Sequence, residues 1–78
     1  MEHTKRCNYY LQLIDLIGQN PDYDLHTTCY LIEAIDRAAL CDTGIDVWEY
    51  CHIFNKVNDS VKFFKDQLEA IRRREVES

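Results

Sequence analysis

Four cysteines and three histidines are the residues of this 78-residue chain whose types could bind a metal or act as nucleophiles. Structural zinc sites usually take their ligands in close pairs, typically two cysteines with two to four residues between them. Here 21, 11 and 9 residues separate the four cysteines, which are Cys7, Cys29, Cys41 and Cys51. Cys51 and His52 are adjacent, but adjacent side chains on a helix diverge by about 100°. We therefore expect no metal site and no cofactor.

The same residues argue against an enzyme. Nucleophilic catalysis requires a cysteine or serine beside a base that a third group holds in place, and the Cys51-His52 dipeptide does not supply that geometry. With two glycines in the whole chain, no glycine-rich phosphate-binding loop is present. Because free cysteine packs as a small apolar residue, we expect four reduced thiols in the core. A metal or redox sensor built on the cysteines is the alternative.

Composition predicts a single all-α domain over residues 1–78. Apolar residues make up 46% of the chain, which is typical of a folded protein, and one proline with two glycines leaves little material for hairpin turns. We expect a three-helix arrangement, in which a helical hairpin packs on a long C-terminal helix. Since no apolar run is long enough for a secretion signal or a membrane span, we expect a cytoplasmic protein without membrane contact.

The expected helices cover residues 4–17, 21–41 and 46–75. Gly18 is placed to end the first helix. The second begins at Asn20-Pro21-Asp22, where proline fits the first turn, and Asp24 offers a later start. Asp46 and Glu49 have the spacing of a capping box, in which each side chain bonds the backbone N–H of the other residue.

The third helix carries the longest apolar stripe of the chain, with members at Val47, Cys51, Phe54, Val57, Val61, Phe64, Leu68 and Ile71. A helix over residues 47–75 would be ~43 Å long, whereas a compact chain of this size is roughly 30 Å across. It therefore extends beyond its own domain or packs against a second chain. A break at Asn58-Asp59-Ser60 would give four helices, but the stripe passes through without a change of register, which favours a continuous helix.

Two features predict a homodimer. The first is the length of the third helix. The second is that the first helix has only a narrow polar stripe and is otherwise apolar, so one neighbouring face would not cover it. The expected dimer interface comprises Tyr9, Leu13, Leu16, Val61, Phe64, Leu68 and Ile71.

The net charge of −5 is concentrated in the middle of the chain. Residues 22–49 hold one arginine, Arg37, and seven acidic residues, namely Asp22, Asp24, Glu33, Asp36, Asp42, Asp46 and Glu49. These acids either serve solubility and helix capping, or they attract a basic partner. Tryptophan and tyrosine are the types most enriched at interface hot spots. The expected partner-binding residues are Glu33, Asp36, Tyr30, Trp48, Asp42 and Glu49.

The helix after Gly44 argues against direct nucleic-acid binding. A helix-turn-helix motif would direct this helix at phosphates, yet it opens with Asp46 and Glu49 and has no base there. We therefore expect a small acidic module that binds another protein as a non-enzymatic inhibitor or regulator. Viruses and mobile elements encode many such modules, and a basic host protein that handles nucleic acid would suit the acidic segment. The alternative is a helical transcription-regulatory or structural accessory protein that acts through its basic C-terminal end, Arg72-Arg73-Arg74.

Overall fold

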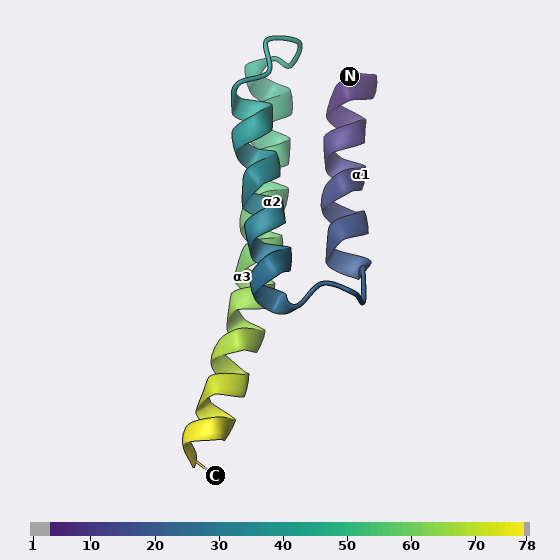
Figure 1. Ribbon diagram of the computed structural model, residues 1–78. Coiled ribbons are helices and arrows are strands. Elements are labelled where there is room, and N and C mark those ends of the chain that lie inside the picture. Colours follow the sequence, from purple (N-terminus) through teal and green to yellow (C-terminus); the bar gives the residue numbers. More distant parts are fainter. Residues whose placement is uncertain (1–3, 78) are drawn as a thin grey trace.

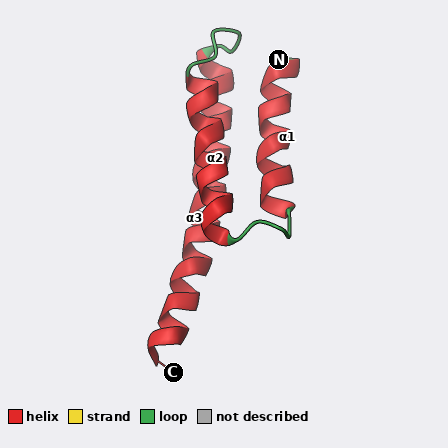
Figure 2. Cartoon of the chain, in the orientation of Figure 1, coloured by secondary structure: helices red, strands yellow, loops and turns green. Residues whose placement is uncertain are grey.

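The computed structural model describes residues 4–77, with side chains as far as residue 75, and consists of three α-helices. These are α1 (Lys5–Gln19), α2 (Leu25–Leu40) and α3 (Val47–Glu77). Each helix packs against the other two. The chain runs down α1, up α2 and down α3, so α1 and α3 are parallel and begin at the same end of the bundle (Figure 1). The predicted all-α, three-helix fold is confirmed, and the described residues contain helices and loops only (Figure 2).

Helix α3 is continuous through residues 58–60, as the unbroken apolar register predicts. Its 31 residues correspond to about 46 Å, and they set the long axis of a molecule that measures 50 × 21 × 21 Å. The C-terminal turns of α3 extend past the ends of α1 and α2 (Figure 1). Residues 69–75 are all exposed there. We call residues 69–77 the overhang.

The boundaries of α1 and α2 differ from the predicted ones at two places. Gly18 does not end α1, which continues to Gln19, and a Cβ atom at Gly18 would lie 3.4 Å from the Phe64 ring. Gly18 therefore lies inside α1, where it faces the Phe64 ring of α3. Asn20 does not cap α2 either, because its side chain accepts the N–H of Asp22 within a turn, at 2.9 Å. The later start is the correct one, since Asp24 accepts the N–H of Thr27 at 2.6 Å.

The core lies along the axis where the three helices meet. Its fully buried side chains are one isoleucine from each helix, Ile14, Ile32 and Ile53, together with Cys7. Val57 and Val61 extend the core along α3, and Phe64 packs partly against it. The apolar stripe predicted for α3 is therefore correct at Val57, Val61 and Phe64, but not at its C-terminal end, where Ile71 is 45% exposed.

In the N-terminal half of α3 the predicted stripe is wrong. Val47 is 77% exposed, Cys51 is exposed and Phe54 is 41% exposed, whereas Ile53 is completely buried. The physical reason is Glu49, which is 6% exposed and faces α1. At 100° per residue, Ile53 points within about 40° of Glu49, so both side chains face inward together. Val47, Cys51 and Phe54 point about 140–160° away from Glu49 and therefore face outward.

Candidate interaction surfaces

Glu49, predicted to bind a partner, instead joins the beginnings of two helices. Its Oε2 atom accepts the backbone N–H of Thr4 at 2.8 Å and the Thr4 hydroxyl at 2.7 Å. Its Oε1 atom accepts the N–H of Asp46 at 3.3 Å, and Asp46 accepts the N–H of Glu49 at 2.8 Å, which confirms the predicted capping box. Thr4 is the N-cap of α1, where it accepts the N–H of Cys7. One carboxylate thus serves the positive ends of both α1 and α3.

Asp42 has a similar internal role in the turn between α2 and α3. Its Oδ1 atom accepts the N–H of Gly44 at 2.8 Å and the guanidinium of Arg6 at 2.7 Å, and its Oδ2 atom accepts the Tyr10 hydroxyl at 2.8 Å. These bonds, that of Gly44 first, hold the pKa of Asp42 below its usual range. A Cβ atom at Gly44 would overlap the Arg6 guanidinium. A side chain at position 44 would therefore displace the flexible Arg6 side chain from Asp42. The motif of the sequence that could have revealed the contact between Asp42 and Gly44 is Asp-x-Gly.

The cysteines divide into two pairs, and all four are free thiols. Cys7 and Cys29 are buried, and burial raises the pKa of both thiols. Cys41 and Cys51 are exposed, so the prediction of four core thiols is wrong for these two. Cys51 is exposed because the rotation of α3 directs it outward. Within the described residues, no group of three histidine, cysteine or acidic side chains lies close enough together to hold a metal ion.

The predicted acidic residues Glu33 and Asp36 lie where α2 borders α3, and both are partly buried. The Tyr50 hydroxyl donates to Asp36 at 3.0 Å, and the Lys65 ammonium lies 3.5 Å from Glu33. Burial, followed by the hydrogen bond to Asp36, raises the pKa of Tyr50. Both carboxylates of α2 therefore already contact side chains of α3 in the same chain.

These contacts align two rows of side chains into one surface, which we call the α2–α3 face. The residues of each row have the i, i+3, i+4, i+7 spacing of one helix side: Glu33, Asp36, Arg37 and Leu40 on α2, and Val47, Tyr50, Cys51 and Phe54 on α3. The bond between Tyr50 and Asp36 ties the two rows together. Phe54 stacks beside Tyr50 at 6.0 Å between ring centres. The face is apolar near the α2–α3 turn and charged farther along α2.

The two aromatic residues predicted to bind a partner flank this face. Trp48 is 78% exposed and follows Val47 directly, so it projects about 100° further around α3. Tyr30 is also exposed and lies three residues before Glu33, on the same side of α2. The structure therefore separates the six predicted partner-binding residues into internal ones, Asp42 and Glu49, and four on or beside the α2–α3 face.

The predicted dimer residues are not on one surface. Val61 and Phe64 pack into the core of their own chain. Leu13 packs partly against that core, while Tyr9 and Leu16 are exposed on α1. Leu68 and Ile71 line a hollow between the start of α2 and the overhang, together with His26, Lys65, Arg72 and Glu75.

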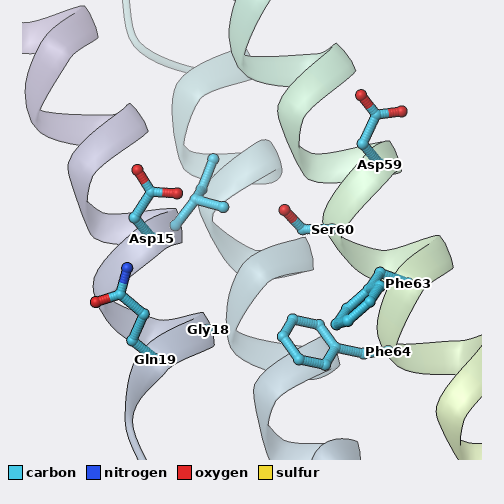
Figure 3. A pocket seen from close by; sticks show the side chains of 8 residues that line it. Asp15, Gly18, Gln19, Asp59, Ser60, Phe63 and Phe64 are labelled. Atoms are coloured by element: carbon cyan, nitrogen blue, oxygen red, sulfur yellow. The ribbon is translucent and has the colours of Figure 1, made fainter.

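A second pocket, which no sequence pattern indicated, lies between α1 and α3. It is lined by Ile14, Asp15, Gly18, Gln19, Asp59, Ser60, Phe63 and Phe64. Figure 3 shows Asp15 and Gln19 on α1 across from Ser60 and the two phenylalanine rings on α3. The rings of Phe63 and Phe64 pack edge to face, with centres 5.3 Å apart. We call this site the α1–α3 pocket.

Comparison of the chain with models of known protein families, with curated proteins and with solved structures gives no match. Among the described residues, no helix combines the length and the apolar character needed to cross a membrane.

Proposed function

We propose that this chain is a non-enzymatic protein-binding module that inhibits or regulates another protein, and that it binds its partner through the α2–α3 face. The observation that carries this proposal is the exposure of three large apolar side chains on this face: Leu40 and Val47, which flank the α2–α3 turn, and Phe54, about two helical turns farther along α3. Apolar side chains that gather on one surface, with a polar rim, are typical of protein interaction sites. Trp48 at the edge adds the residue type most enriched in binding hot spots.

The charges around the face define the chemistry of the partner. Glu33 and Asp36 border its apolar part on α2, and Asp46 lies in the adjoining turn. Arg37 is the base within the α2 row. The best complement is an apolar helix or strand flanked by lysine or arginine, because opposite charges at the rim accelerate association and exclude acidic competitors. A basic protein that handles nucleic acid meets this description.

The test uses two leucines of equal exposure on different surfaces. Leu40 and Leu16 are each 63% exposed, so replacing either with lysine should leave the fold intact. Tagged wild type, Leu40→Lys and Leu16→Lys are used to capture proteins from a lysate of the cells that express the chain. We expect one stoichiometric basic partner with the wild type and with Leu16→Lys, and its loss with Leu40→Lys.

Two results would contradict the proposal. Retention of the partner by Leu40→Lys, with loss by Leu16→Lys, would move the binding surface to α1. Failure of every form to capture a stoichiometric protein would argue against a binding module. Circular dichroism of the three proteins checks that each remains helical.

Self-association is a further part of the proposal. The exposed Ile71 of the overhang and the partly exposed Leu68 just before it are suited to packing against a second copy, and Tyr9 and Leu16 offer additional apolar area on α1. Light scattering at micromolar concentration should then give about twice the 9.3 kDa mass of the chain. Ile71→Asp should return the protein to one copy without loss of helicity, whereas a single copy for the wild type at every concentration would remove the dimer.

The alternative function, binding through the basic C-terminal end, is favoured by one observation. Arg72, Arg73 and Arg74 are exposed on the overhang. Arg73 forms an ion pair with Glu69 at 2.8 Å. Nucleic acid recovered with the wild type, and lost when Arg72 and Arg74 are replaced by glutamine, would support this alternative.

A further inference from the structure

We propose that the α1–α3 pocket binds the guanidinium group of an arginine side chain presented by the partner protein. The inference rests on the proposed binding function for the source of the arginine, but the pocket lies on a different side of α3 from the α2–α3 face. Its lining combines two carboxylates, Asp15 and Asp59, with an exposed aromatic ring, Phe63. A planar cation that both stacks and donates hydrogen bonds is the ligand that such a lining complements.

The aromatic wall is fixed by packing. Phe63 is 58% exposed, although it lies within the part of α3 that contacts α1. The Phe64 ring lies edge to face with it, and Phe64 itself faces Gly18 on α1. The ring of Phe63 therefore has a defined orientation and an open side. A guanidinium prefers such a surface because it is more weakly hydrated than an ammonium ion.

The polar side chains of the lining can accept hydrogen bonds. Asp15 and Gln19 belong to α1, and Asp59 and Ser60 belong to α3. In Figure 3 the Ser60 hydroxyl is directed toward α1, whereas the Asp59 carboxylate is directed away from the two phenylalanine rings, at the rim of the pocket. Guanidinium carries five N–H donors in one plane, so it can bond several of these acceptors while it stacks on the ring. An ammonium group has three donors and no flat face, and it would use fewer of these partners.

The chain itself places a cation at the edge of the pocket. The Lys56 ammonium lies 2.9 Å from Asp15, and both side chains remain partly exposed. Lys56 neutralises one of the two carboxylates, so the local charge of Asp15, Asp59 and Lys56 together is about −1 at neutral pH. Lys56 and an incoming guanidinium compete for Asp15. Removing the lysine charge should therefore strengthen binding, which is an effect opposite to that of removing an acid.

The experiment uses an isolated arginine probe, N-acetyl-arginine methylamide, and the amide NMR spectrum of the whole protein. The chain has two glycines, whose amide signals appear in a separate region of the spectrum. Gly18 lines the pocket and Gly44 lies in the α2–α3 turn at the far end of the bundle, so one reports binding and the other serves as an internal control. We expect saturable shifts of Gly18 and Ser60 with a Kd of about millimolar size, because one side chain buries little area. Gly44 should not move.

Matched probes and variants separate a specific site from general attraction. The citrulline analogue, which has nearly the same shape without the charge, should not bind, and the lysine analogue should bind about threefold or more weakly than the arginine probe. Asp59→Asn should weaken the arginine probe about threefold to tenfold, and Lys56→Met should strengthen it by a similar factor. Asp66→Asn, an exposed acid on α3 outside the pocket, should have no effect.

Three results would overturn the inference: no shift at Gly18, equal binding of the citrulline probe, or weaker binding by Lys56→Met in a protein that remains folded. Because the probe requires no partner protein, its failure would reject the pocket while leaving the α2–α3 face untested. Capture of the partner through the Leu40 surface would likewise stand without the pocket. Binding of the probe by the wild type, with the expected changes in the variants, supports the site directly.

Discussion

The bonds of Glu49 predict that this residue contributes more to stability than any exposed acid of the chain. Its carboxylate accepts the N–H and the hydroxyl of Thr4 and the N–H of Asp46, and it is 6% exposed. A hydrogen bond to a charged group contributes about 1.5–3 kcal/mol when it is buried. Placement beside two helix N-termini adds about 0.3–1 kcal/mol for each helix.

Replacing Glu49 with alanine should therefore lower the free energy of unfolding by about 3 kcal/mol, since solvent and the Thr4 hydroxyl will recover part of the loss. For a domain of this size that corresponds to a fall in the melting temperature of about 12–24 °C. Glu49→Gln keeps one acceptor oxygen and the shape, but its NH₂ group would face a donor, so we expect a loss of about 1–2 kcal/mol.

The control is Glu69→Ala on the same helix. Glu69 forms an exposed ion pair with Arg73, for which the expected loss is below about 0.5 kcal/mol. Because both variants exchange glutamate for alanine, their helix propensities cancel. The measurement is urea unfolding followed by circular dichroism. A Glu49→Ala protein as stable as Glu69→Ala would refute the view that this carboxylate joins α1 to α3.

Three further predictions follow from the same packing. Ile53→Ala should lower the free energy of unfolding by about 2–5 kcal/mol as a core truncation. Phe54→Ala should lower it by about 1 kcal/mol, because Phe54 is 41% exposed and Ile53 is not exposed at all. Urea unfolding measures both, and the reverse order would support the stripe predicted from the sequence. Iodoacetamide at neutral pH should label Cys41 and Cys51 quickly, and Cys7 and Cys29 only on unfolding, because burial shields Cys7 and Cys29 and raises the pKa of both thiols. Peptide mass spectrometry identifies the labelled cysteines. The pKa of Asp42 in the folded protein lies below its ordinary value of 3.8. The stability that Asp42 contributes is therefore complete above pH 3.8 and is lost as the pH falls through the pKa of the folded protein. The drop in melting temperature on acidification should be smaller in Asp42→Asn than in the wild type.

The helices themselves were readable from the sequence because local chemistry decides them. The capping box at Asp46 and Glu49 and the uninterrupted register through residues 58–60 correctly gave the start and the continuity of α3. Gly18 misled because a glycine near a helix end is usually a terminator. Here Gly18 lies inside α1 and faces Phe64, 46 positions later in the sequence, and no local pattern carries that contact.

The candidate surfaces were less predictable, because they depend on which side of each helix faces inward. Val47, Cys51 and Phe54 have ideal spacing for a core stripe, and periodicity alone cannot distinguish that row from the one containing Ile53. The α1–α3 pocket combines residues from positions 14–19 and 59–64, none of which forms a motif. Trp48 and Tyr30 were identifiable as exposed aromatics, because they exceed what the apolar stripes require.

The orientation of α3 about its own axis connects the stability of this molecule to its proposed function. A buried carboxylate at position 49 is satisfied only when it faces Thr4 at the start of α1. The same orientation directs Val47, Cys51 and Phe54 away from the core and beside Leu40. An apolar residue at position 49 would remove this constraint, and the more apolar row could then turn inward. The polar contact between α1 and α3 therefore maintains the exposed apolar surface that we propose for partner binding.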